Sequence, residues 1–113
     1  MGLISSLFRG KDINSRLQEM RGVERAVLLD VRNADEFGRG HIPGAINIPA
    51  DSIDSIGRKV KEKDTPIYSY CLSGARSGRA AAALRALGYT NVTNIGGINR
   101  YKGGLEKDNE QVF

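Results

Sequence analysis

The sequence predicts an α/β domain in which a parallel sheet is covered by helices on both faces. Short apolar runs that suit strands alternate with amphipathic segments that suit helices along the 113 residues, without an internal repeat. The composition, with 40% hydrophobic and 27% charged residues, is that of a folded globular domain. No apolar run approaches the roughly 20 residues that a membrane-spanning helix needs. We therefore expect one domain without integral membrane contact.

The first predicted elements are a helix and a strand. Asp12 is a suitable N-cap for a helix that places Ile13 and Leu17 on one face and ends at Gly22. Residues 26–29 are apolar throughout and stop at an aspartate. Such a run is typical of a strand that is buried on both faces of a sheet.

The middle of the chain predicts shorter elements. Asn33 is expected to cap a short acidic helix that breaks at Gly38. Two isoleucines alternate within residues 46–48, directly ahead of a proline, and indicate a brief strand. Residues 51–60 carry apolar side chains at helical spacing and predict a further short helix.

The last third predicts a strand, a helix and a strand. Residues 66–70 form a strand pattern that ends at Cys71. The alanine-rich stretch 77–87 is the strongest helix signal in the chain. A final strand is expected over residues 92–95. In parallel sheets ligands bind beyond the carboxyl ends of the strands, so Cys71 lies where chemistry is expected.

Positive charge is concentrated around this cysteine. The chain has a net charge of +4, and no Asp or Glu occurs between Thr65 and Leu105. The cations of that segment are Arg76, Arg79, Arg85, Arg100 and Lys102. Such a segment favours a small anionic ligand or an acidic partner. Nucleic acid is disfavoured, because the chain has few aromatic residues and no dense run of lysine and arginine.

The loop over residues 71–76 connects a predicted strand to the start of a helix, where backbone N–H groups lack helical partners. A cysteine sulfur at their focus would be held as a thiolate, favoured by the helix end and by the Arg76 guanidinium. Gly74 suits a cradle of amides, and the Ser73 hydroxyl is a further candidate donor. The sequence thus favours a reactive thiolate over a buried, inert cysteine.

Other site chemistries find little support. With one cysteine, the chain has no intramolecular disulfide and no multi-cysteine metal site. His41, the one histidine, lies in a Gly-His-Ile-Pro-Gly turn, and the chain has no nucleophile-elbow motif for a serine triad. We expect His41 to be structural, although a role as general base for Cys71 stays open.

Three blocks of sequence stand out together. They are 29–32 (Leu-Asp-Val-Arg) with Glu36-Phe37 and 40–49 (Gly-His-Ile-Pro-Gly-Ala-Ile-Asn-Ile-Pro), then 70–77 around Cys71, then Gly96-Gly97 followed by Tyr101. With these blocks the chain resembles the rhodanese (thiosulfate sulfurtransferase) domain family, and specifically its single-domain members. The resemblance runs from about residue 12 to residue 106, with Tyr101 where a tryptophan is usual.

The resemblance implies a fold and a site. The fold would be a three-layer α/β/α arrangement around a central, mainly parallel sheet of five strands. Cys71 would be the catalytic residue of a thiosulfate sulfurtransferase that needs no cofactor and no metal. The loop that binds substrate and persulfide would comprise Leu72, Ser73, Gly74, Ala75 and Arg76. Structural support of the loop would come from Asp30, Arg32 and His41.

The implied reaction is a double displacement. The Cys71 thiolate takes the outer sulfur of thiosulfate or a persulfide, and cyanide or a cellular thiol then removes it. Arg76 would neutralise the anionic donor, and Asp30 with Arg32 would form a buried ion pair that fixes the loop. A sulfur-accepting protein is a further expected partner.

Alternatives from other classes remain. Cysteine phosphatases and arsenate reductases of related fold place five residues between Cys and Arg, whereas four intervene here. The lone cysteine also disfavours arsenate reduction, which normally needs a resolving thiol. A non-catalytic protein-binding module would not need Cys71 and Arg76. A dedicated sulfur carrier shares every residue with the enzyme.

We divide the chain into an apolar and basic N-terminal segment, 1–11, and a single domain over 12–113. The first segment is too short and too early charged for a secretory signal peptide. Together with the single thiol, this predicts a cytoplasmic protein.

Overall fold

Four parallel strands form the central sheet of the structure, a computed structural model that describes residues 12–108. The strands are β1 (Val27–Asp30), β2 (Ile46–Asn47), β3 (Ile67–Cys71) and β4 (Val92–Gly97). They lie in the order β2-β1-β3-β4, and each neighbouring pair is parallel. The predicted α/β class with a parallel sheet is confirmed, whereas the described residues contain four strands rather than five.

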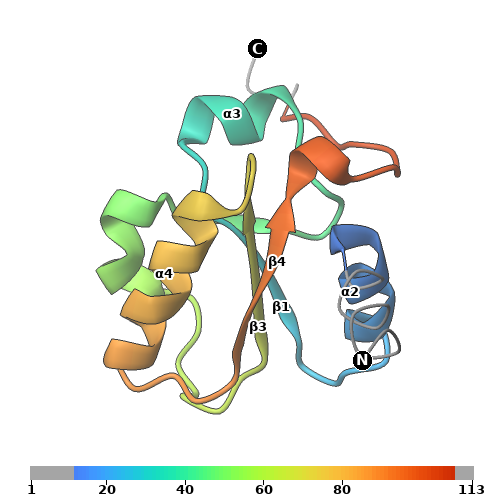
Figure 1. The fold of residues 1–113 in the computed structure, drawn as a ribbon. Helices are drawn as coiled ribbons and strands as arrows, with labels where there is room; N and C mark the ends of the chain where they lie inside the picture. Colours follow the sequence, from blue (N-terminus) through green and yellow to red (C-terminus); the bar gives the residue numbers. More distant parts are fainter. Residues whose placement is uncertain (1–11, 109–113) are drawn as a thin grey trace, which may run out of the picture.

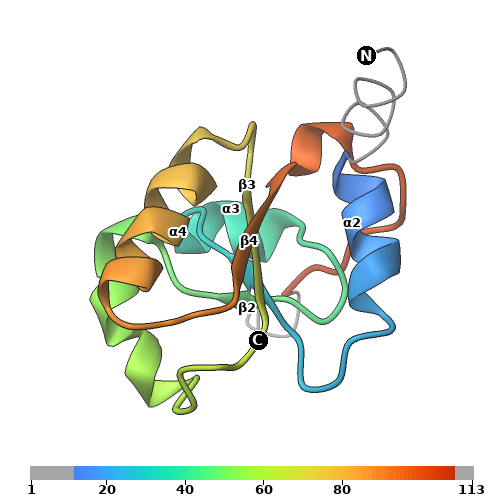
Figure 2. The same ribbon diagram turned by 60° about the horizontal axis from the view of Figure 1, so that its bottom comes forward.

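Helices cover both faces of this sheet (Figures 1 and 2). The helical elements are α2 (Ile13–Met20), α3 (Ala34–Arg39), η1 (Ala50–Arg58), α4 (Ala75–Ala86) and η2 (Ile98–Arg100). Helix α4 and η1 lie on one side of the sheet, and α2 lies on the other (Figure 2). Helix α3 lies beyond the carboxyl ends of the strands (Figure 1). The arrangement has three layers, as the sequence predicted.

Two buried clusters hold the layers together. The larger one lies between the sheet and the layer of α4 and η1, and it includes Leu29, Ile56 and Leu84. The smaller one lies between the sheet and α2, and it includes Leu17 and Leu28. Neighbouring residues of β1 thus point to opposite faces, which explains why its sequence is apolar throughout.

The caps of the first helices match the sequence signals. The Asp12 side chain accepts hydrogen bonds from the backbone N–H groups of the first turn of α2. Asn33 and Glu36 form a capping box at α3, in which each side chain accepts a hydrogen bond from the other residue's backbone N–H.

Three elements differ from the sequence prediction. The η1 segment is 3₁₀-helical, and Ser52 departs from helical backbone angles within it. Helix α4 begins at Ala75, two residues before the expected start. The third difference is a bulge between β3 and β4, where Ser69 lies opposite Asn94 but Tyr70 lies opposite Gly96. The extra residue on β4 places Gly97 beside Cys71.

The end of the molecule away from Cys71 is fixed by side-chain contacts to backbone carbonyls. The Tyr89 hydroxyl donates to the Val60 carbonyl, and Lys63 Nζ donates to the Leu87 carbonyl at 2.8 Å. Lys63 Nζ also lies 4.5 Å from the centre of the Tyr89 ring. These contacts tie the C-terminal end of α4 to the loop that precedes β3.

The predicted N-terminal segment, residues 1–11, lies outside the described residues. Within the part that the structure describes, no helix has the length and apolar character needed to cross a membrane.

Candidate active site

The candidate site is the loop between β3 and α4. Strand β3 ends at Cys71 and α4 begins at Ala75, so only three residues separate the strand from the helix. Gly74, the N-cap of α4, has a φ of +107°, in the left-handed region that favours glycine. Its backbone N–H donates a hydrogen bond to Cys71 Sγ at 3.0 Å. The sulfur therefore lies against the amino end of α4, as the sequence predicted.

The glycine pair at the end of β4 makes room for this loop. A Cβ atom at Gly97 would lie 2.3 Å from the Leu72 carbonyl oxygen and 2.6 Å from Ser73 Cα. Gly96 has a φ of +106°. Backbone N–H of Asn99 then donates to the Leu72 carbonyl at 3.1 Å. A side chain at Gly97 would push the loop away from the sheet, whereas a side chain at Gly96 would strain its left-handed backbone.

Two polar side chains that the sequence analysis missed lie beneath the loop. The Ser77 hydroxyl is fully buried and lies 2.6 Å from Asn94 Oδ1 and 3.2 Å from the Gly74 carbonyl. Asn94 Nδ2 donates to the same carbonyl at 3.1 Å, and Gly96 N–H donates to Asn94 Oδ1 at 3.0 Å. This network links α4, the loop and β4, and fixes the backbone that surrounds the sulfur.

The hydrogen bonds around Cys71 lower the pKa of its thiol. Burial by itself raises the pKa of the Cys71 thiol, because it disfavours the thiolate. The Ser77 hydroxyl and the backbone N–H groups of Ser77, Gly74 and Ser73 outweigh burial and bring the pKa below its ordinary value. The hydroxyl contribution comes from Ser77 and not from Ser73, where the sequence analysis placed it. The direction agrees with the predicted thiolate.

The sulfur lies below the surface. Cys71 is 1% exposed, so a donor must bring its reacting atom into the loop. Asp30 of β1 pairs with Tyr70 of β3. The next residues of the two segments, Val31 and Cys71, therefore lie beside each other at the end of the sheet. Val31 also lines a hollow of about 190 Å³, together with Arg76 and residues of the β1–α3 and β2–η1 connections. A second hollow, of about 290 Å³, is lined by Ser73 and Gly97 on the other side of the loop.

Arg76 is paired with an acidic side chain that the sequence analysis did not assign to it. Its guanidinium donates to both carboxylate oxygens of Glu36, with Nη1–Oε1 at 2.8 Å and Nη2–Oε2 at 3.1 Å. The hydrogen bonds to Glu36 raise the pKa of Arg76, and the negative charge of Cys71 adds to this effect. Arg76 thus lies near enough to Cys71 to interact with its charge, but its paired donors are directed at Glu36 instead of at the loop.

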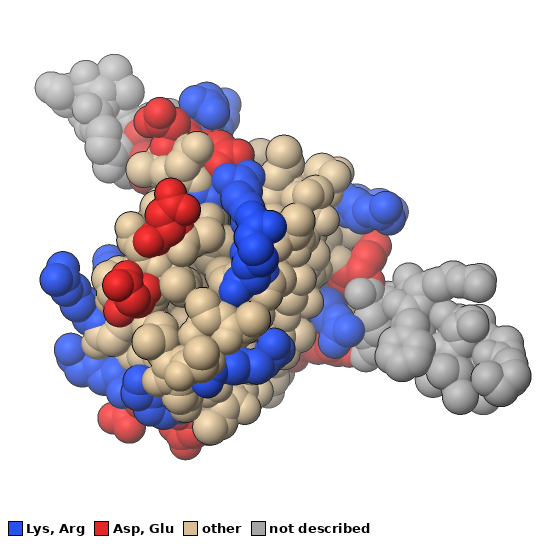
Figure 3. All heavy atoms as spheres, turned by 60° about the vertical axis from the view of Figure 1, so that its left-hand side comes forward, with Lys and Arg blue, Asp and Glu red and all other residues tan. Residues whose placement is uncertain are grey.

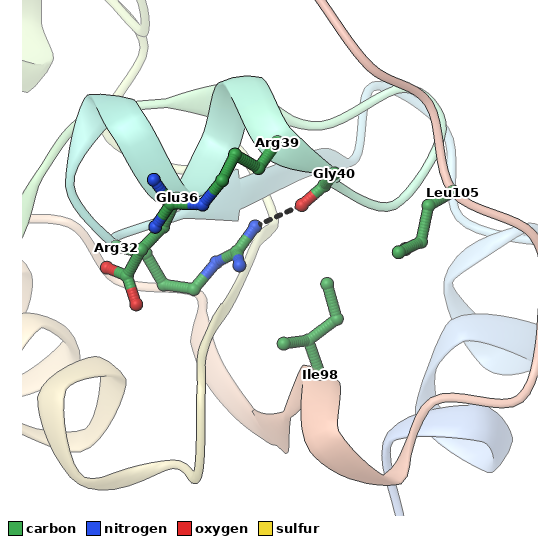
Figure 4. A pocket seen from close by; sticks show the side chains of 6 residues that line it. All are labelled: Arg32, Glu36, Arg39, Gly40, Ile98 and Leu105. Atoms are coloured by element: carbon green, nitrogen blue, oxygen red, sulfur yellow. Dashed lines mark hydrogen bonds between the residues drawn. The ribbon is translucent and has the colours of Figure 1, made fainter.

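Asp30 and Arg32 form the buried ion pair that the sequence predicted. Arg32 Nη2 lies 2.7 Å from Asp30 Oδ2, and both side chains are almost fully buried. The same nitrogen donates to the Gly40 carbonyl at 2.7 Å. Figure 4 shows the Arg32 guanidinium pointing toward Gly40, between α3 and the side chains of Ile98 and Leu105. The pair thereby joins the end of β1 to the turn after α3.

His41 fixes this turn. Its ring stacks on Phe37 with 3.7 Å between centroids, and Nδ1 lies 2.8 Å from the Phe37 carbonyl oxygen. Nε2 lies 3.6 Å from Glu106 Oε1, and His41 and Glu106 also exchange backbone hydrogen bonds. These contacts suit the structural role expected for His41, and none of them is with Cys71.

The remaining predicted loop residues face outward. Leu72 is 48% exposed, and Ser73 and Ala75 are exposed as well. Their backbone, rather than their side chains, forms the wall around the sulfur. Among residues 12–108, no group of three or more His, Cys, Asp or Glu side chains could hold a metal ion.

A family model for the rhodanese-like domain matches residues 14–104. This chain belongs to the rhodanese-like domain family, and the predicted resemblance is confirmed.

Relatives and solved structures agree with this assignment. The chain is 38% identical over 71 residues to "Thiosulfate sulfurtransferase PspE" of Escherichia coli, which covers 62% of this chain and 68% of that protein. It is 33% identical over 105 residues to human "Thiosulfate:glutathione sulfurtransferase", and the aligned region covers 81% of this chain and 90% of that protein. A solved "rhodanese with anions from E. coli" superimposes with a TM-score of 0.68 at 34% identity, covering 73% of this chain and 98% of that chain.

Replacing Ser77 tests the hydroxyl beneath the loop. In Ser77→Ala we expect the pKa of Cys71 to rise, because a hydroxyl that favours the thiolate is lost. Cys71 is the one cysteine of the chain, so the ultraviolet absorbance of the thiolate against pH, corrected with Cys71→Ser, reports it directly. Ser73→Ala is the control and should leave the midpoint unchanged. Identical midpoints in both variants would contradict this role of Ser77.

Replacing Asp30 tests the buried ion pair. Asp30→Ala leaves the Arg32 guanidinium buried without its carboxylate, and we expect the free energy of unfolding to fall by about 3–5 kcal/mol. Urea unfolding measures the loss. Asp64→Ala is a matched control, because Asp64 belongs to an exposed pair with Arg25 and its loss should change little. Equal stability of the two variants would show that the buried pair does not support the fold.

Proposed function

We propose that this chain is a sulfurtransferase that moves a sulfane sulfur from a thiosulfate-like donor to a thiophilic acceptor through a persulfide on Cys71. The observation that carries the proposal is the position of Cys71 Sγ, 3.0 Å from the Gly74 N–H at the start of α4, with a lowered pKa. A thiolate is the attacking form of cysteine, and this environment favours it. The sulfurtransferase names of the two relatives support the same reaction class.

In the first step the Cys71 thiolate attacks the outer sulfur of thiosulfate. A sulfur–sulfur bond forms, the bond between the two donor sulfurs breaks, and its electron pair leaves with sulfite. The product is a Cys71 persulfide anion, so atoms and charge balance without any redox partner. The outer sulfur would lie among the backbone N–H groups of the loop, of which that of Gly74 donates to Cys71 Sγ.

In the second step an acceptor nucleophile attacks the outer sulfur of the persulfide. With cyanide, thiocyanate leaves and the Cys71 thiolate is restored. With a thiol, the sulfur leaves as a low-molecular-weight persulfide, and a sulfur-accepting protein would use the same chemistry. We place this cycle in the cytoplasm, where thiols are kept reduced.

Geometry gives the supporting residues distinct roles. Ser77 and Asn94 hold the loop backbone, and the Ser77 hydroxyl also favours the thiolate form of Cys71. Asp30 and Arg32 fix the end of β1 beside the site, and His41 fixes the turn after α3. Leu72 presents an exposed apolar side chain next to the nucleophile, suited to contact with an acceptor.

Intact-mass measurement tests the proposal. After incubation with thiosulfate, or with methanethiosulfonate as a second donor, we expect the chain to gain one sulfur atom. Cyanide should remove it, with thiocyanate as product, and Cys71→Ser should gain nothing. An unchanged mass with both donors would contradict sulfur transfer and favour a binding module. Release of phosphate from an aryl phosphate would instead favour a cysteine phosphatase.

A further inference from the structure

The ion pair between Glu36 and Arg76 changes the charge of the candidate site. It joins the first turn of α3 to the first turn of α4, across 40 positions of sequence, and both carboxylate oxygens are used. The side chains are 20% and 32% exposed, so the pair is partly shielded from water. Hydrogen bonds from Arg76 lower the pKa of Glu36 to about 2. Glu36 is therefore ionised at neutral pH, and its charge cancels that of Arg76.

The hollows beside Arg76 contain further balanced charge. One of about 190 Å³ is lined by Asp51 and Arg76 as its charged residues, and a neighbouring one of about 300 Å³ adds Arg79. Glu36 is paired with Arg76. The carboxylates of Glu36 and Asp51 and the guanidinium groups of Arg76 and Arg79 therefore have no net formal charge together. Figure 3 shows basic and acidic side chains close to one another on this side of the molecule, formed by α4 and η1.

The positive charge of Arg32, at the end of β1, is also balanced. Arg32 forms an ion pair with Asp30, with 2.7 Å between Nη2 and Oδ2. The Cys71 thiolate adds one negative charge at the point of attack. A thiosulfate dianion would thus approach an anionic nucleophile without net positive charge from these pairs, although the surrounding segment of sequence is cationic.

From this balance we propose that Glu36 determines donor specificity: by neutralising Arg76, it makes the site favour sulfane donors with a single negative charge, such as thiosulfonates, over dianionic thiosulfate. The inference rests on the sulfur-transfer function proposed above. The chemistry is the same for both donors. With a thiosulfonate, the thiolate takes the outer sulfur, the sulfur–sulfur bond of the donor breaks, and the electron pair leaves with a sulfinate.

The variant Glu36→Gln tests this role. Glutamine preserves a side-chain oxygen for the capping box of α3 and one hydrogen bond to Arg76, but removes the negative charge. We expect kcat/KM for thiosulfate to rise on the order of tenfold, mainly through a lower KM, because the positive charge of Arg76 is no longer neutralised. With methanethiosulfonate, a monoanion with the same sulfane bond, the gain should be clearly smaller. The ratio of the two values is the readout.

Two further variants separate a local effect from a general one. Asp35→Asn removes the same charge from the neighbouring, exposed position of α3 and should leave the ratio unchanged. Arg76→Ala leaves the Glu36 carboxylate without its partner and should lower thiosulfate turnover more than methanethiosulfonate turnover. Combining Glu36→Gln with Arg76→Ala restores a neutral pair of positions and should return the ratio toward that of the parent protein.

The outcomes are distinguishable from failure of the proposed function. If the parent chain takes sulfur from neither donor, sulfur transfer itself is wrong. If parent and Glu36→Gln both turn over with the same donor ratio, or if Asp35→Asn changes the ratio equally, donor specificity does not come from Glu36. Thermal unfolding of each variant, together with sulfur loading of Cys71 by mass, shows whether a loss of activity is a loss of fold.

Discussion

The short connection between β3 and α4 is the constraint on which the site depends. Three residues take the chain from an extended strand into a helix, and this brings backbone N–H groups onto the sulfur that ends the strand. Such a turn needs a positive φ at Gly74 and the absence of a side chain on the neighbouring strand, which Gly97 provides. The chemistry of Cys71 thus follows from backbone geometry, and the exposed side chains of the loop are left to contact small molecules or partners.

Charge at this end of the sheet is organised in pairs. Asp30 cancels Arg32 within the interior, and Glu36 cancels Arg76 at the rim. The first pair is almost fully buried and holds the backbone of β1 and the following turn. The second is partly exposed and joins the first turns of α3 and α4. A cationic stretch of sequence can therefore produce a site whose own charge is close to balanced, because its counterions come from another part of the chain.

The sequence predicted much of the fold and the centre of the site, for reasons that are local. Apolar runs located the strands, caps located α2 and α3, and the residues around Cys71 predicted a strand-to-helix loop. What it missed depends on contacts between distant segments. Asn94 lies on β4, far along the chain from the sulfur that it helps to position, and has no local motif. The sequence indicated Glu36 only as an acidic residue in the first turn of a helix, a position that acidic residues favour in any case. Its pairing with Arg76 therefore left no separate signal. The 3₁₀ character of η1 likewise has no clear signal in its apolar spacing.

The bulge in β4 has a consequence for how this protein could vary. Because Ile95 is an extra residue in the pairing, Asn94 remains opposite Ser69 while Gly97 reaches the level of Cys71. Deleting that isoleucine would give a more regular ladder, but it would remove a buried side chain from the cluster between the sheet and α2. The irregular step thus serves two purposes, because it buries Ile95 on one face and places the glycine pair beside Cys71, and a change of length in these six residues should be tolerated less readily than an insertion in a surface turn.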